Sequence, residues 1–135
     1  MNAENYLTDV KKRFLEARSQ CDRALAQVDS SLWTQRPHPE SNSLATLMQH
    51  LAGNMLSRWS DFFASDGEKA TRDRDAEFED PAVPSVDELK ERWEAGWRCL
   101  FDALDTIRAE DLDRVVTIRS QPHTVVEALD RQMTH

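Results

Sequence analysis

The side chains in this sequence best suited to bind a metal ion or move a proton are four histidines, His38, His50, His123 and His135. His38 lies between two prolines and His123 directly precedes a predicted helix cap, so we expect both at the surface. His50 and His135 each lie near the inward-facing side of a predicted helix, and these two helices should pack together. Two inward imidazoles on facing helices can share a divalent ion such as zinc or nickel, usually with a third protein ligand and a water molecule.

The pairing of His50 with His135 has a plainer alternative. A histidine at the edge of an apolar stripe also occurs as a hydrogen-bonded core residue, and the sequence has neither an HExxH motif nor a second helical histidine four residues from His50. Asn54 and Arg58 follow His50 at intervals of one helical turn. They are candidates to support the ligands from a second layer or to bind an anion, and the alternative for both is a surface or packing role.

The elements that carry these residues are four helices, which apolar residues spaced by three and four predict over about 3–28, 43–64, 85–107 and 124–135. The sequence has only 3 glycines and 5 prolines, which fits long helices with few turns. We therefore predict an all-α, up-and-down four-helix bundle that forms a single domain over residues 1–135. The positions expected in its core are Leu7, Val10, Phe14, Ala17, Cys21, Ala24 and Val28; Leu44, Leu47, Met48, Leu51, Met55, Trp59 and Phe62; Val86, Leu89, Trp93, Trp97, Leu100, Leu104 and Ile107; and Val125, Val126, Leu129 and Met133.

Residues that cap helices mark three of the four starts. Ser85 with Glu88 and Thr124 with Glu127 have the spacing of capping boxes, and residues 41–43 offer an N-cap for the second helix.

Three segments outside the helices also carry predictions. Residues 29–42, DSSLWTQRPHPESN, form the first connection, in which we expect Trp33 to fold back onto the bundle. Residues 65–84 form a long charged connection with two prolines and no packed element of its own, either a functional lid or a mobile loop. Residues 115–124, VVTIRSQPHT, are β-branched and alternating, which is compatible with an extended strand.

Charge, hydropathy and cysteine usage exclude several classes of function. The 25 acidic and 17 basic residues give a net charge of −8, which repels a phosphate backbone, so a nucleic-acid partner is not expected. No apolar run approaches the roughly 20 residues of a membrane span, and the N-terminus lacks a secretory pattern. Cys21 and Cys99 have no CxxC spacing and lie on different helices, which disfavours a thiol-redox protein. We expect a cytoplasmic protein that does not span a membrane.

The fourth predicted helix is short for a bundle. Its 12 residues cover about 18 Å, against about 35 Å for the first and third helices. Half of the groove between the other helices would be left open. We expect either that the native chain continues or that a second protomer fills the gap, because an exposed apolar groove of that size is rarely tolerated in a monomer.

Two stretches carry a resemblance to a known family. Residues 41–80, which contain QHLAGN, and residues 115–135, which end in RQMTH, resemble a branch of the DinB/YfiT-like superfamily, and the similarity extends over nearly the whole chain. The resemblance implies a four-helix bundle, often dimeric, with a divalent metal held by three histidines. One of these comes from the second helix and two come from the fourth, four residues apart.

The resemblance assigns the ligands residue by residue. His50 matches the ligand of the second helix and His135 the first ligand of the fourth, while the third would fall four residues beyond the last residue present. Related proteins include transferases and isomerases that use low-molecular-weight thiols, in which the metal lowers the pKa of the thiol. The implied function is a metal-dependent enzyme of the thiol-transfer type. The alternative is a non-catalytic, dimeric interaction or stress-response module whose metal site is degenerate.

Overall fold

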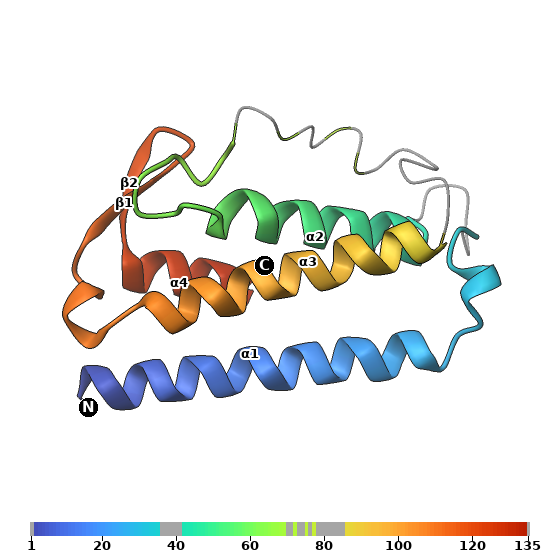
Figure 1. The fold of residues 1–135 in the computed structure, drawn as a ribbon, viewed down its shortest axis with the longest axis horizontal. Coiled ribbons are helices and arrows are strands. Elements are labelled where there is room, and N and C mark those ends of the chain that lie inside the picture. Colours follow the sequence, from blue (N-terminus) through green and yellow to red (C-terminus); the bar gives the residue numbers. More distant parts are fainter. Residues whose placement is uncertain are drawn as a thin grey trace.

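The computed structural model describes residues 2–35, 42–69, 72, 75, 77 and 86–134. It is mostly helical, as predicted, with a small two-stranded sheet in addition (Figure 1). The elements in chain order are α1 (Ala3–Ala26), the 3-10 turn η1 (Ser30–Leu32), α2 (Leu44–Trp59), α3 (Val86–Thr106), the 3-10 turn η3 (Ala109–Asp111), β1 (Val115–Ile118), β2 (Gln121–Thr124) and α4 (Val125–Thr134).

Short polar side chains begin the helices as expected. The Ser43 hydroxyl accepts the backbone N–H of Thr46 at 3.1 Å and caps α2. Thr124 and Glu127 form the predicted capping box, since the Thr124 hydroxyl accepts the N–H of Glu127 and the Glu127 carboxylate accepts the N–H of Thr124. The capping box predicted at Ser85 lies partly outside the described residues.

Helix α2 ends earlier than the sequence predicted. The pattern suggested a helix to residue 64, whereas α2 ends at Trp59 and the chain turns over the next residues. Asp61 has a φ of 49°, in the left-handed region that a continuing α-helix cannot use. Phe62 is still buried, so the apolar pattern runs on past the end of the helix and gives no sign of it.

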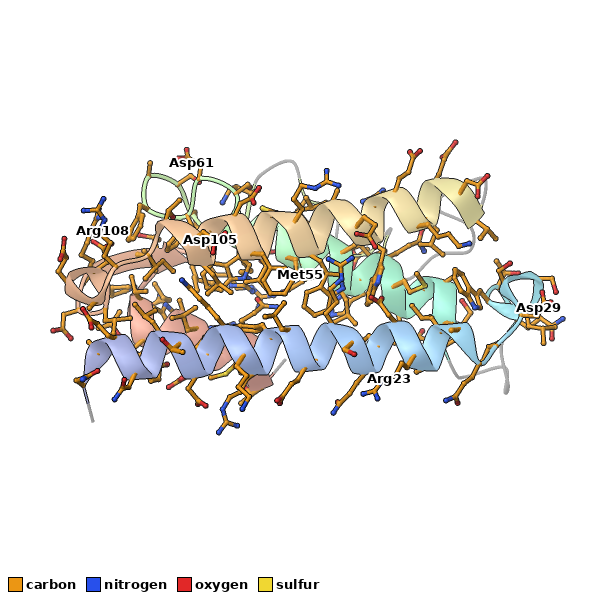
Figure 2. All side chains as sticks on the ribbon, turned by 60° about the horizontal axis from the view of Figure 1, so that its bottom comes forward. Arg23, Asp29, Met55, Asp61, Asp105 and Arg108 are labelled. Carbon is orange, nitrogen blue, oxygen red and sulfur yellow. The ribbon has the colours of Figure 1, made fainter. Side chains whose placement is uncertain are left out.

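The core forms between α3 and the helices on either side of it. Every predicted core position of α3 except the half-buried Val86 is buried, and Trp33 packs back onto the bundle as expected. In α1 the predicted stripe is buried only in its first half, and Ala24 is exposed. Figure 2 shows side chains filling the space between α1 and the other helices, with Met55 in the middle of it. Leu47, predicted to be in the core, is 42% exposed.

The helices do not follow the predicted up-and-down order, because α2 and α3 run in the same direction (Figure 1). At their starts, Trp33 accepts the backbone N–H of Ala45 while Lys90 lies 5.6 Å from the Trp33 ring centre. At their ends, Trp59 and Ala103 line the same surface pocket. The connection between α2 and α3 is long enough to return along the whole length of α2, which permits two consecutive parallel helices.

The β-branched segment before α4 forms an antiparallel hairpin of β1 and β2. Its turn residues Arg119 and Ser120 have φ values of 51° and 62°, as in the turns preferred by tight two-residue hairpins. The carboxylate of Asp66 accepts both of their backbone N–H groups, at 2.8 and 2.7 Å. The hairpin is therefore tied to the segment that follows α2, at the end of the bundle where α2 and α3 finish (Figure 1).

Across the described part of the chain, no helix combines the length and the apolar character that crossing a membrane requires.

Candidate functional site

Helix α2 buries two faces that differ in chemistry. One face is apolar and packs on α3, where Ala52 and Met55 lie next to Gly96. The other face is polar, and its members recur at spacings of three and four, so that they share one stripe. The fully or nearly buried polar residues of this stripe are Thr46, Gln49, Asn54, Ser57 and Arg58. Because buried polar groups need partners, this face of α2 requires a polar cover.

The first part of that cover is the segment just after α2. The Ser57 hydroxyl donates to the carbonyl oxygen of Gly67 at 2.7 Å and accepts the backbone N–H of Lys69 at 2.9 Å. The Lys69 ammonium group donates to the carbonyl oxygens of Ser57 and Asp66 at 2.7 and 2.6 Å. These bonds fix residues 66–69 against the polar stripe of α2.

The second part of the cover is Glu77, which is 6% exposed. Its carboxylate lies 3.1 Å from Nδ1 of His50. The guanidinium of Arg72, whose side chain is 5% exposed, donates through Nε and Nη2 to the two carboxylate oxygens at 3.0 and 2.9 Å. Because a carboxylate only accepts hydrogen bonds, Nδ1 of His50 is the protonated nitrogen in this pair. In this tautomer Nε2 is the ring nitrogen that carries the acceptor lone pair.

Two neighbours on α2 explain why Glu77 can lie so close to the helix. A Cβ atom placed on Gly53 would be 1.8 Å from a carboxylate oxygen of Glu77, so a side chain at this position would displace the carboxylate. The Gln49 amide donates to the backbone carbonyl of Glu77 at 3.3 Å. His50, Gly53 and Gln49 therefore hold Glu77 in place against the polar stripe of α2.

Arg58 lies about two helical turns after His50, on the same polar stripe of α2. Its side chain is 8% exposed, and Nη2 lies 3.5 Å from the carboxylate of Glu68. Nη1 has no hydrogen-bond partner among the described residues. Burial and the positive charge of Arg131 lower the pKa of Arg58 to about 10, which still leaves it charged at neutral pH. A small cavity of about 20 Å³ adjoins Arg58, Arg131 and Asn54.

The family of the chain follows from a comparison with protein-family models. A model described as a protein of unknown function (DUF1572) matches residues 1–135. The chain belongs to this family. Among curated proteins, no sequence matches the chain significantly.

In this DUF1572 protein, the predicted site residues separate into three groups. His50 lies on the polar stripe of α2 beside Glu77, while Asn54 and Arg58 are buried further along the same stripe. His123 is on the hairpin, with Nε2 3.4 Å from Nη1 of Arg131. His38 and His135 lie outside the described residues, and the predicted pairing of His50 with His135 stays a prediction.

The two cysteines behave as the sequence suggested. Both are free and half-buried, one on α1 and one on α3. Burial raises the pKa of Cys21 and of Cys99, with further contributions from the carboxylates of Asp22 and Asp102. A raised pKa keeps a thiol protonated and poorly nucleophilic, so neither cysteine has the features of a reactive thiol.

Sequence reasoning missed the two residues that complete the site around His50, namely Arg72 and Glu77. Residues 65–84 were predicted to form a charged connection without a packed element, yet these two side chains are only 5% and 6% exposed. A signal for them was present in α2. The polar residues at 46, 49, 50, 54, 57 and 58 of this chain, together with Gly53, follow a helical stripe of their own, which indicates a second buried face.

Of the groups around His50, only the histidine itself has the features of a metal ligand. A zinc or nickel site needs three or four donors, and no group of three His, Cys, Asp or Glu side chains converges within the part of the chain that the structure describes. Glu77 is unsuited to be a ligand, because Arg72 bonds both of its oxygens. His50 fits, since a metal-binding histidine almost always donates its other ring N–H to a carboxylate or carbonyl.

Proposed function

We propose that this DUF1572 protein is a divalent-metal-binding helical protein of the DinB/YfiT-like type, in which His50 and His135 bind zinc or nickel together with a further donor. The observation that carries the proposal is the 3.1 Å contact between Nδ1 of His50 and the buried carboxylate of Glu77. A histidine held in this way has its ring orientation and its tautomer fixed before a metal arrives.

Each residue of the group has a separate role in the proposal. His50 presents Nε2 to the ion. Glu77 holds the proton on Nδ1 and makes the ring a stronger donor toward a cation. Arg72 fixes Glu77 from the opposite side and offsets the cost of burying a carboxylate. Asn54 and Arg58 lie one and two turns from His50 on the same stripe and belong to a separate pocket.

The resemblance to thiol-dependent transferases and isomerases supplies the reaction class. When bound, a divalent ion lowers the pKa of a coordinated thiol and favours the thiolate. The co-substrate that fits this chemistry is a low-molecular-weight thiol. The protein's own cysteines are poor substitutes, because burial raises the pKa of both thiols.

Equilibrium dialysis of the 135-residue chain against zinc and nickel, followed by elemental analysis, tests the proposal. We expect the wild-type chain to bind metal and the variants His50→Ala and His135→Ala to bind at least tenfold more weakly. Glu77→Gln keeps an oxygen acceptor but removes the charge, and we expect a loss of about 10- to 100-fold in affinity. His123→Ala is the matched control, since it removes an imidazole on the hairpin, and should bind like wild type.

Circular dichroism spectra and elution volumes of all variants separate loss of metal from loss of fold or of oligomeric state. Metal binding that survives His50→Ala at wild-type affinity would contradict the proposal. So would a folded wild-type chain that binds neither ion. That result would favour the alternative of a non-catalytic interaction module.

A further inference from the structure

We propose that the cavity between Arg58 and Arg131 is a binding site for a small oxyanion that carries a hydroxyl group, such as hydrogen phosphate or a hydroxycarboxylate. This site is distinct from the position of His50, and it does not depend on the proposed metal function. Arg58 comes two helical turns after His50, a rise of about 12 Å along the helix axis.

The first observation is an incompletely paired, buried cation. The Arg58 side chain is more than nine-tenths buried, yet Nη1 has no hydrogen-bond partner among the described residues. Leaving a buried charged donor unpaired is costly, and such groups occur where a ligand or ion completes them. Nη1 is therefore the first donor of the site.

The second observation is the set of polar groups that share the cavity with Arg58. Arg131 lines it and is exposed, so the cavity reaches the surface on that side. Gln132 accepts the indole N–H of Trp59 through Oε1, which leaves its amide N–H groups as donors. Oδ1 of Asn54 is buried and has no partner within the described part of the chain. This acceptor calls for a hydroxyl group on the ligand.

The third observation is an excess of positive charge in a strongly acidic protein. Arg58 interacts electrostatically with Arg131, Arg119 and Arg72. Arg72 is paired with Glu77, whereas Arg58 and Arg119 share the single carboxylate of Glu68, at 3.5 and 3.6 Å. Such long, divided contacts leave part of the positive charge uncompensated, which favours an anion.

The size and walls of the cavity restrict the ligand. Its volume of about 20 Å³ is room for one water-sized group, so a bound anion would place a single oxygen in it and keep the rest of its atoms towards the surface. The walls around the polar groups include the apolar side chains of Phe62, Val116 and Ile118, and apolar surroundings strengthen contacts between charges. Guanidinium groups bind carboxylate and phosphate oxygens through paired N–H donors.

A nuclear magnetic resonance titration at constant ionic strength tests the inference. The probes are sodium phosphate, sodium glycolate and sodium acetate, with sodium chloride as the reference salt. The reporter is the indole N–H of Trp59, which lies at the cavity, and the control is the indole N–H of Trp93, which is bonded to Asp22 elsewhere. We expect saturable shifts of Trp59 with phosphate and glycolate, and no shift of Trp93. Glycolate should bind about threefold or more tighter than acetate, because only glycolate offers a hydroxyl to Asn54.

Two matched variants assign the effect to the cavity. Arg131→Gln should weaken phosphate and glycolate about tenfold, whereas Arg92→Gln, which removes the same charge from an exposed position on α3, should change the affinity by less than twofold. Both positions are exposed, so both variants should fold.

Several outcomes would overturn the inference. They are shifts that do not saturate, equal losses in the two arginine variants, or equal affinities for acetate and glycolate. His50→Ala should leave anion binding unchanged. A failure of the metal proposal and a failure of this inference are therefore separate results.

Discussion

Replacing Gly53 with alanine should destabilise the protein by about 2 to 4 kcal/mol, although alanine is the better helix former. The new Cβ atom would lie 1.8 Å from a carboxylate oxygen of Glu77 and 2.6 Å from its carboxyl carbon. Normal carbon contacts need more than 3 Å, so the carboxylate would have to move by more than 1 Å. That displacement breaks its bonds to Arg72, which are 2.9 and 3.0 Å long.

The magnitude follows from two opposing effects. Alanine in place of glycine inside a helix stabilises by about 1 kcal/mol. Breaking a buried ion pair destabilises by about 3 to 5 kcal/mol, because the partner charge stays buried. Arg72 keeps Glu68 at 3.5 Å, which softens the loss and favours the lower end of the range.

Urea unfolding of a double-mutant cycle measures the effect and its cause. The cycle compares wild type, Gly53→Ala, Glu77→Ala and the double variant. In the Glu77→Ala background the carboxylate is absent, so Gly53→Ala should stabilise by about 1 kcal/mol. The substitution therefore changes sign with the residue at position 77. A stabilising effect of Gly53→Ala in the wild-type background would refute the packing of Glu77 on this face of α2.

Three further predictions concern the parts that hold the fold together. Tyr6→Phe removes a 2.7 Å hydrogen bond to Asp130 and should lower the free energy of unfolding by about 1 kcal/mol. Burial and Asp130 raise the pKa of Tyr6 in the folded state, so wild type should progressively lose this advantage as the pH rises above 10. Urea unfolding of both proteins at pH 7 and 10.5 measures the difference. Backbone N–H donors lower the pKa of Asp66 below its ordinary value of 3.8, so Asp66→Ala should destabilise the protein at neutral pH. The difference from wild type should shrink only as the pH falls below 3.8 towards the lowered pKa of the folded state, as thermal unfolding in a series from pH 7 down to pH 2 would show. Thr124→Ala removes the cap shared with Glu127 and should lower the free energy of unfolding by about 1 kcal/mol in urea.

The helices could be predicted because their apolar periodicity and caps are local signals. The α3 stripe and the Thr124 capping box are read from neighbours within a few residues, and both agree with the structure. The end of α2 could not be read in this way, because Phe62 continues the apolar spacing after the helix has turned at Asp61. The direction of α3 depends on the path of the long connection before it, which the local pattern does not contain.

The candidate site was predictable only on the α2 side. His50, Asn54 and Arg58 are related by helical spacing, and the sequence placed them together. Arg72 and Glu77 are two of many charged residues in the segment 65–84, and no local pattern in the sequence distinguishes a buried ion pair there from a solvated one. The distinguishing feature lies on α2, where Gly53 opens the space that the carboxylate fills.

The role of His50 is tested by its imidazole nitrogen spectrum, recorded with and without zinc in protein labelled with ¹⁵N. Before zinc is added, we expect a proton on Nδ1, held by Glu77. Zinc should then shift the Nε2 resonance and leave the proton on Nδ1. A proton on Nε2 in the absence of metal, or a His50 ring that does not respond to zinc, would contradict this role.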